Sequence, residues 1–506
     1  MNEAKNRKYG AALSVANMVI SIVIGAVYTP AVLRFLGQGE YGVYTLSLSL
    51  VAYLNLLDMG FGNTLIRFSA RARAENKPEK DIYGMFLILY TAAAALAFSV
   101  GLCMYFNIGS FFSASFTASE TVQLKTLFFI MLINTTLVFP NSVFSAIIRS
   151  NQRFVFANVL SLIMNVGRHA VTVLFLFVGG RTVSMALTAL GVTALTLVSN
   201  IYFCFAKIRV RFGFGRFEKK FYREVFGYSF FILLNIAADQ LFAGTDKVIL
   251  GRICGSSAVA VYGVAVTFQT YFSEFSNSVS GVFLPHITQL AAKENGAGEM
   301  SLLFARVGRV QFVMLSYLLL GFVTYGREFV ALWAGEGYGD AYLIAVIIMA
   351  SSLIPLSQNI GVAVLQAYGK HGYRSVLYLV IAALNAAISV PLAAAFGGVG
   401  AAAGTAAASI LGETALMNLF YSKKMGLDVS AYWRQTGIYA VKMLPVAMVF
   451  FASALVTGGE GWKPLVLKAA CGTTASLPYV FFVILTKEER RAVLSRLGLA
   501  KIKVIK

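Results

Sequence analysis

Apolar runs follow one another along almost the whole chain, and each is long enough to cross a lipid bilayer. A membrane-spanning helix needs about 20 predominantly apolar residues, and fourteen stretches of the 506-residue sequence meet this requirement. Only helices and closed barrels satisfy their backbone groups in hydrocarbon, and runs without two-residue alternation indicate helices. The sequence therefore predicts an all-α integral membrane protein with 14 transmembrane helices. The predicted spans are residues 10–33, 41–66, 83–106, 124–148, 157–178, 183–206, 225–251, 258–284, 307–330, 341–366, 374–396, 399–421, 436–457 and 464–486.

The positive charges of the chain collect in every second gap between these runs. Counted from the N-terminal tail, eight alternate segments hold 32 of the 42 Lys and Arg residues. Because positively charged loops stay on the cytoplasmic side, we predict that these segments and both termini are cytoplasmic. The net charge of +20 is then spread over short loops beside the membrane, which favours anionic membrane lipids over nucleic acid as partners. The expected location is the cell membrane of a bacterium, in a multi-pass arrangement.

The two halves of the chain resemble each other at a nearly constant offset. Residues 37–54 fall opposite 255–272, and residues 177–187 fall opposite 395–405. Two parallel six-helix lobes around a central cavity would follow from such a repeat, and chance similarity between membrane segments is the alternative. The predicted parts are an N-lobe (1–206), a basic cytoplasmic linker (207–224), a C-lobe (225–422), an appended helix pair (435–486) and a basic cytoplasmic tail (487–506). For the linker, the alternative is an amphipathic segment in the membrane interface.

Polar side chains within the predicted spans are unevenly distributed. They recur at steps of three or four residues, which places them on one face of a helix, in the spans that begin at residues 10, 41, 225 and 258. Because polar groups in hydrocarbon favour a water-accessible cavity, we predict that these four spans line one, although helix packing also uses such residues. The uncharged cavity candidates are Asn17, Asn55, Asn235, Gln269 and Asn277.

Charged side chains within the spans are the strongest candidates for a site. Four carboxylates are predicted to couple transport to protons or sodium, with structural ion pairs or helix-end positions as the alternative: Asp58, Asp239, Asp246 and Glu274. Four cations are candidates for holding an anionic headgroup. The alternative is that their side chains extend from helix ends to the membrane surface. These cations are Arg34, Arg67, Arg168 and Lys247. The histidines and the four cysteines have no ligand spacing, so no metal site or disulfide is predicted. No nucleotide-binding loop or catalytic motif occurs, so we expect a secondary-type transporter without a cofactor.

Two segments resemble a known family. Residues 29–68, TPAVLRFLGQGEYGVYTLSLSLVAYLNLLDMGFGNTLIRF, and residues 245–265, TDKVILGRICGSSAVAVYGVA, are similar to the Wzx-type polysaccharide-biosynthesis flippases of the multidrug, oligosaccharidyl-lipid and polysaccharide exporter superfamily. The resemblance implies two six-helix lobes around a V-shaped cavity, alternating access, and polyprenyl-diphosphate-linked oligosaccharides as substrates. Related peptidoglycan-precursor flippases carry arginines within helices 1, 2 and 8, and this chain has none there. The matching positions are Arg34, Gly37, Tyr41, Gly42, Asp58, Asp246 and Gly251.

These observations together predict a flippase that moves a lipid-linked oligosaccharide from the cytoplasmic to the outer leaflet for surface polysaccharide assembly. Glycosyltransferases or a polymerase of the same pathway are the expected protein partners. An ion-coupled multidrug and toxin extrusion antiporter is the first alternative, and a non-transporting membrane scaffold of glycan assembly is the second. A membrane-embedded glycosyltransferase is disfavoured, because no predicted outer gap exceeds about 20 residues, too short for a catalytic domain.

Overall fold

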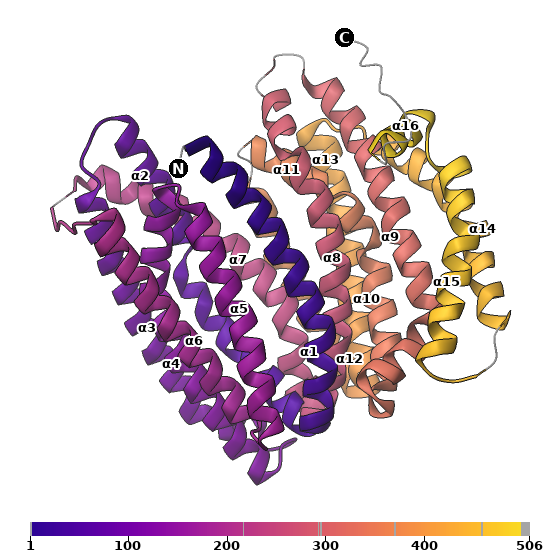
Figure 1. Ribbon diagram of the computed structural model, residues 1–506, viewed down its shortest axis with the longest axis horizontal. Helices are drawn as coiled ribbons and strands as arrows, with labels where there is room; N and C mark the ends of the chain where they lie inside the picture. Colours follow the sequence, from indigo (N-terminus) through magenta and orange to yellow (C-terminus); the bar gives the residue numbers. More distant parts are fainter. Residues whose placement is uncertain are drawn as a thin grey trace. The chain divides into compact units, whose positions relative to one another are not determined.

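The computed structural model describes residues 3–215, 217–291, 293, 296–368, 371–456 and 459–496, and every regular element within them is a helix (Figure 1). The predicted spans lie almost entirely in helical segments, which confirms the all-α fold class. The α-helices are α1 (Glu3–Leu54), α2 (Phe61–Ala74), α3 (Lys80–Phe112), α4 (Ala118–Ser150), α5 (Phe154–Phe177), α6 (Thr182–Phe203), α7 (Lys219–Ile253), α8 (Ser256–Ala291), α9 (Gly296–Ala334), α10 (Gly339–Ser357), α11 (Asn359–Ala367), α12 (His371–Ala408), α13 (Met417–Met425), α14 (Val429–Val456), α15 (Trp462–Tyr479) and α16 (Lys487–Arg496). Short 3₁₀ or π segments are η1 (Asn55–Asp58), η2 (Cys204–Ile208), η3 (Glu336–Tyr338), η4 (Ser409–Leu416) and η5 (Val480–Ile484).

Two of the predicted loops are kinks inside continuous helices. Gly37 (φ 72°) lies within α1 and Gly397 (φ 59°) lies within α12. Both have a positive φ, a conformation that glycine adopts at little steric cost, so the chain changes direction there without a loop. Among the described residues, eleven stretches are long and apolar enough to cross a membrane, and α8 is not one of them.

The predicted span 41–66 is interrupted near its middle. After α1 ends, η1 leads into Met59 and Gly60, which both have left-handed backbones with φ of 51° and 66°. Asp58 lies at this break, where its carboxylate accepts from the Tyr90 hydroxyl at 2.9 Å and from the backbone amides of Gly60 and Phe61. A carboxylate beside the first amides of α2 is favoured by the helix dipole, so the break gives Asp58 a structural role.

The chain forms two compact units. Unit 1 comprises Met1–Val264 and His371–Thr405, and unit 2 comprises Ala265–Lys370 and Ala406–Lys506. In unit 1, α4 packs against α1, α3 and α6, and α1 also packs along α5. In unit 2, α9 packs against α10 and α14, and α15 packs against α14. The lobe and linker boundaries drawn from the sequence stay a prediction.

Gly42 of α1 permits a close contact with the first turn of α8 in unit 1. A Cβ atom added to Gly42 would lie 1.8 Å from the backbone carbonyl oxygen of Ser256. The Ser256 hydroxyl also donates to Glu120 at the start of α4, and Ser115 donates to the carbonyl of Gly251 at 2.6 Å. The motif glycines Gly42 and Gly251 therefore belong to a junction of helix ends.

Replacing Gly42 by Ala is expected to destabilise the protein by about 1–3 kcal/mol, because the obstructing atom is backbone and cannot turn aside. The measurement is thermal unfolding of the purified protein in detergent. Gly191→Ala is the matched control, since Gly191 lies within α6 with no atom within 4 Å of an added Cβ. Equal unfolding temperatures for the two variants would show that the junction tolerates a side chain.

Backbone kinks recur in the two halves at the offset of the predicted repeat. Gly37 and Gly255 both have a positive φ, as do Gly179 and Gly397. The sequence interval from the first glycine to the second is identical in the two pairs. Such kinks support an internal repeat, because similar composition alone would not place them at one interval.

A hydrogen bond between side-chain amides also recurs. Asn200 of α6 donates to Asn141 of α4 at 2.8 Å. In the second half, Gln358 donates to Asn418 of α13 at 2.8 Å. At the same offset Asn418 corresponds to Asn200, and Gln358 is next to the position that corresponds to Asn141. The two contacts are therefore similar in kind, although Asn359, which corresponds to Asn141, donates to Asn277 instead.

Candidate functional site

Unit 1 contains a polar cavity made of two adjoining pockets. The first has a volume of about 450 Å³ and the second about 330 Å³, and they share Asn141, Ser145 and Arg149 of α4. The first pocket is lined by Asn55, Asp58, Gly60, Gly62, Asn63, Ile66, Tyr90, Asn141, Ser142, Ser145, Ala146, Arg149 and Ile236. The second is lined by Asn141, Ser145, Ile148, Arg149, Ala157, Leu160, Ser161, Met164, Asn165, Arg168, Val192, Thr196 and Asn200. We call the two together the unit 1 cavity.

Two arginines supply the positive charge of this cavity. Arg149 lies in the last turn of α4, where a cation is stabilised by the helix dipole. Arg168 projects from the middle of α5, and its charge acts on the nearby hydroxyls of Tyr28 and Tyr44. Both arginine side chains are exposed, so their guanidinium groups remain available to a ligand.

Amide side chains and one carboxylate complete the polar lining of the unit 1 cavity. Asn200 donates to Asn141 across α6 and α4, and Asn165 of α5 donates to Ser21 of α1 at 2.8 Å. Among the described residues of the lining, Asp58 is the single acidic one, and its carboxylate is engaged at the start of α2. The lining therefore has more positive than negative charge and many amide groups, a combination suited to an anion that also carries hydroxyls.

A second polar cluster surrounds Asp246, which is 2% exposed. One carboxylate oxygen, Oδ2, accepts from Tyr262 and from Thr405, both at 2.5 Å. Asn385 accepts from Ser389 at 2.8 Å, and its Oδ1 lies 3.1 Å from the Thr405 hydroxyl, whose single proton points to the nearer Asp246 carboxylate. We call these five residues, drawn from α7, α8 and α12 of unit 1, the Asp246 cluster.

The Asp246 cluster contains unsatisfied polar atoms. Asp246 Oδ1 and Asn385 Nδ2 have no hydrogen-bond partner within the part of the chain that the structure describes. Lys247 follows in sequence and attracts the Asp246 carboxylate electrostatically. A buried carboxylate with an unused oxygen is costly unless a proton or a cation neutralises it.

The surrounding oxygens are the ligands that hard cations prefer, so the cluster fits a sodium ion or a proton. The described residues hold no group of three or more His, Cys, Asp or Glu that could bind a transition metal.

The remaining predicted residues of unit 1 with described side chains belong to neither the unit 1 cavity lining nor the Asp246 cluster. Asn17 donates to the backbone carbonyl of Asn158 at 2.9 Å and so joins α1 to α5. Arg67 stacks on the ring of Tyr228 at 4.3 Å, and Arg34 is exposed on α1. The predicted Asn235 and Asp239 have side chains outside the described part of the structure.

The candidates of unit 2 belong to hydrogen-bonded contacts between helices. Gln269 donates to Ser352 of α10 at 2.9 Å, and Asn277 accepts from Asn359 of α11 at 2.8 Å. Glu274 is half-buried on α8. Of all the predicted site residues, Asn55, Asp58 and Arg168 line the unit 1 cavity, and Asp246 centres the second cluster.

Comparison with known families assigns the chain. A family model described as "Polysaccharide biosynthesis protein" matches residues 8–291, more than half of the sequence. The chain belongs to this family. The match includes both segments on which the resemblance to Wzx-type flippases was based, and that resemblance is confirmed.

Curated relatives of this family member are distant but cover much of the chain. A "Putative O-antigen transporter" of Shigella flexneri is 22% identical over 67% of this chain and 79% of its own length. The "Uncharacterized membrane protein EpsK" of Bacillus subtilis is 22% identical over 94% of this chain and 95% of its own. With the apolar helices, these relatives confirm a multi-pass membrane protein of the cell membrane. They indicate a transporter, and no enzyme family is indicated.

Solved structures of similar fold come from two transporter groups. A structure titled "Lipid II flippase MurJ, inward closed conformation" gives a TM-score of 0.73 at 14% identity, covering 96% of this chain and all of that one. An inward-facing multidrug MATE transporter gives a TM-score of 0.61 at 13% identity, covering 82% of this chain and 99% of that one. At these identities the likeness establishes the fold of this polysaccharide-biosynthesis family member and nothing finer.

The sequence interpretation did not select several lining residues of the unit 1 cavity. Arg149 was counted with the cytoplasmic loop charges, although Asn141, Ser145 and Arg149 recur at steps of four, which places them on one face of α4. Asn165 and Arg168 are likewise one helical turn apart on α5. This periodicity could have identified helices 4 and 5 as cavity walls.

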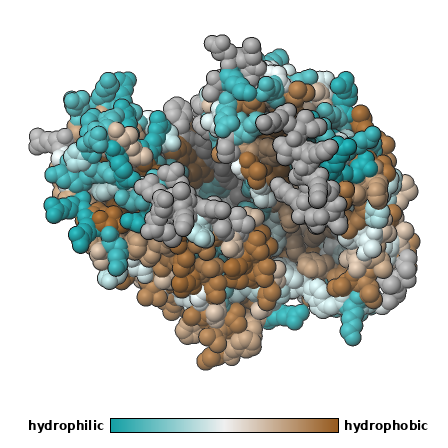
Figure 2. Space-filling model, turned by 45° about the horizontal axis from the view of Figure 1, so that its top comes forward, coloured by the Kyte–Doolittle hydropathy of each residue, from teal (hydrophilic) through white to brown (hydrophobic). Residues whose placement is uncertain are grey.

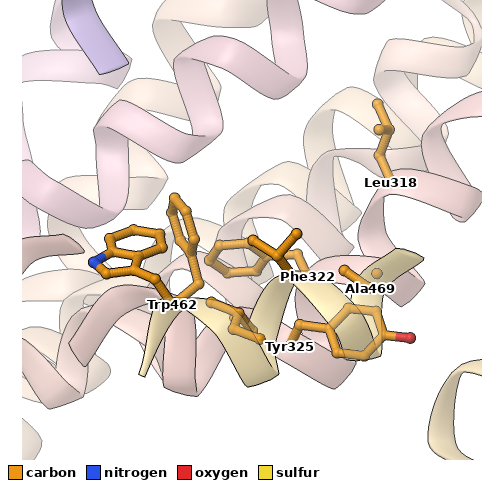
Figure 3. Close-up of a pocket in the computed structure, with 10 residues that line it drawn as sticks. Leu318, Phe322, Tyr325, Trp462 and Ala469 are labelled. Carbon is orange, nitrogen blue, oxygen red and sulfur yellow. The ribbon is translucent and has the colours of Figure 1, made fainter. Parts of the chain in front are cut away.

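Unit 2 contains an apolar pocket of a different character. Its volume is about 370 Å³, and its lining comes from α9 and α15. Figure 3 shows Phe322 and Tyr325 of α9 with Trp462 of α15 around the pocket, without a charged residue. The Tyr325 hydroxyl bonds to Ser453 of α14 at 2.5 Å. The pocket can contact hydrocarbon but offers nothing to a headgroup, so it is not part of the polar site.

Proposed function

We propose that this protein is a flippase that translocates a polyprenyl-diphosphate-linked oligosaccharide from the cytoplasmic to the outer leaflet for surface polysaccharide assembly. The observation that carries the proposal is the unit 1 cavity, with Arg149 and Arg168 among amide side chains. Guanidinium groups pair with phosphate oxygens in two parallel hydrogen bonds, and amides donate to and accept from sugar hydroxyls. The names of the relatives, a transporter of O-antigen and a "Probable low-salt glycan biosynthesis flippase", point to the same class of substrate.

The two halves of the repeat differ in charge, which supports a diphosphate site in the first half. At the offset that relates the paired glycines, Arg149 corresponds to Ala367 and Arg168 to Ala386. Alanine offers no donor to an anion. The two cavity arginines therefore have no cationic counterpart at the corresponding positions of the second half.

Ion coupling at the Asp246 cluster is the second part of the proposal. Asp246, Asn385, Thr405 and Ser389 would hold a sodium ion through their oxygens, or Asp246 would take up a proton. Either would supply neutralising charge to a buried carboxylate. Moving one charge across the membrane provides about 2.3 kcal/mol per 100 mV, enough to bias a conformational equilibrium.

The topology completes the proposal: 14 transmembrane helices, cytoplasmic termini, and alternating access by two six-helix lobes. Within unit 1, the start of α1 and the α2–α3 connection lie at the same end of the helices (Figure 1), which supports a shared side for these two basic segments. Glycosyltransferases or a polymerase of the pathway would supply and consume the lipid-linked glycan.

The main alternative is an antiporter that exports cationic drugs. The charge of the described cavity lining argues against it, because two exposed arginines repel a cation, and the one carboxylate among those lining residues is hydrogen-bonded at the start of α2. A membrane scaffold without transport activity would have no use for such a cavity.

The test is flipping in vesicles that contain the purified protein and a polyprenyl-diphosphate-linked oligosaccharide with a fluorescent sugar. A membrane-impermeant reductant bleaches only the outer leaflet. We expect complete bleaching with the protein and bleaching of about half the label in protein-free vesicles, since a polar headgroup does not cross hydrocarbon unaided. Uptake of a cationic dye without glycan flipping would favour the antiporter, and neither activity would favour the scaffold.

A further inference from the structure

The segment that connects α6 to α7 is folded against unit 1. It begins in η2 at the end of α6 and continues without regular structure to Gly215. From residue 202 to residue 217 the sequence has four cations and no acidic residue. We call this segment together with the last two residues of α6, residues 202–215, the 202–215 hook, and Figure 1 draws it in magenta at the end of unit 1 where α2 is labelled.

One side of the 202–215 hook packs into the protein. Arg209 has a left-handed backbone (φ 60°) that ends η2, and Val210 then donates its amide to the carbonyl of Cys204 at 3.1 Å. Val210 is buried, and the ring of Phe212 lies 6.1 Å from that of Phe144 in α4. These contacts turn alternate residues of the segment inward.

Backbone hydrogen bonds fix the far end of the hook to the start of α3. The amide of Gly213 donates to the carbonyl of Lys80 at 2.8 Å, and the amide of Gly215 donates to the Asp81 carboxylate at 3.1 Å. A Cβ added to Gly84 would lie 1.8 Å from the carbonyl oxygen of Gly213. So close an approach does not suit a free linker, and the hook is a defined surface.

The other side of the hook presents cations and aromatic rings outward. Lys207, Arg209 and Arg211 are exposed, and no ion pair joins them to another residue of the described chain. Tyr202 is 67% exposed and Phe214 is 66% exposed. Figure 2 shows hydrophilic side chains gathered over this end of unit 1, next to apolar helix flanks.

We infer that the 202–215 hook binds the phosphate headgroups of anionic phospholipids in the leaflet that this end of the helices faces. The three cations lie where the helices leave the hydrocarbon, and their charge complements that of such headgroups. Tyrosine rings favour the boundary between hydrocarbon and water, and the exposed Tyr202 and Phe214 flank the three cations in the sequence. The inference is independent of the proposed substrate, because it concerns bulk lipid and a surface outside the unit 1 cavity.

The experiment uses the full-length protein with Phe214→Trp, reconstituted in phosphatidylcholine vesicles with a minor fraction of brominated lipid. Bromine quenches a nearby indole, and the protein without the substitution supplies the background from its three native tryptophans. Brominated phosphatidylglycerol is expected to quench the introduced indole at least twofold more than brominated phosphatidylcholine at the same mole fraction, because charge raises its local concentration. High salt is expected to reduce the ratio.

Matched variants separate the hook from general charge attraction. Arg209→Asn with Arg211→Gln removes two charges from the hook, and Asn tolerates the left-handed backbone at position 209. This variant is expected to bring the quenching ratio to about one, since charge selectivity is lost. Lys219→Gln with Lys220→Gln removes two charges from the start of α7 and is expected to leave the ratio unchanged. An equal loss of the quenching ratio in both charge variants would overturn the inference. A ratio of one in Phe214→Trp itself would also overturn it and would indicate that the hook faces solvent or a protein partner.

Discussion

Replacing both Arg149 and Arg168 by Gln is expected to reduce flipping of the lipid-linked oligosaccharide at least 100-fold. A hydrogen bond to a charged group contributes about 1.5–3 kcal/mol, and each 1.4 kcal/mol corresponds to a factor of about ten. Two such contacts to a diphosphate therefore account for the loss. The measurement is the initial rate of bleaching in the vesicle assay, with protein amounts matched by gel filtration.

Arg153→Gln is the matched control for this prediction. Arg153 is also an exposed arginine, next to the start of α5, but it lines neither pocket of the unit 1 cavity. Its replacement is expected to leave flipping within about twofold, because Arg153 lines neither pocket and the charge of an exposed side chain is screened by salt. Lysine at positions 149 and 168 is expected to give an intermediate rate, since an ammonium keeps the charge but not the paired hydrogen bonds. A folded double Gln variant that flips at the normal rate would contradict the proposed diphosphate site.

The positions of the helices could be predicted because burial in lipid leaves a long apolar run in the sequence. The loops and kinks between helices could not be predicted, because each depends on the backbone conformation of a single residue. Gly37 and Gly397 were interpreted as loop residues, whereas their positive φ values make kinks inside α1 and α12. The left-handed Met59 has no such signal at all, since that conformation is uncommon for residues other than glycine.

The candidate site was only partly predictable, because one face of a helix does not identify the neighbour it contacts. Asn17 lies on a polar stripe of α1 that the sequence assigned to a cavity, yet this stripe pairs with α5 through Asn158. Arg149 was explained by topology alone, and that explanation concealed its place in the cavity lining. A cation at a helix end can serve both purposes.

Asp246 was selected from the sequence, but its partners were not. Asn385 and Thr405 are distant from it along the chain, and Asn, Ser and Thr are ordinary helix-packing residues in membranes. Only the fold brings them to the carboxylate. Long-range contacts of this kind leave no local pattern in a single sequence.

Asp246→Asn is expected to abolish the effect of the coupling ion on stability and transport. An ion that binds only the folded state stabilises it by about 2.7 kcal/mol at a concentration about 100 times its dissociation constant. If the ion is sodium, replacing choline chloride with sodium chloride at constant ionic strength is expected to raise the unfolding temperature of the native protein by several degrees. The Asn variant keeps an oxygen that can accept from Tyr262 and Thr405, so it is expected to fold while losing this response.

Glu274→Gln serves as the control, because Glu274 is also a carboxylate within a long helix, is half-buried in unit 2, and is not a member of the Asp246 cluster. It is expected to retain the full sodium response. Should the unfolding temperature of the native protein depend on acid pH and not on sodium, with Asp246→Asn insensitive to both, the coupling ion is a proton. A native protein that responds to neither, or an Asn variant that responds as the native protein does, would leave Asp246 with a purely architectural role.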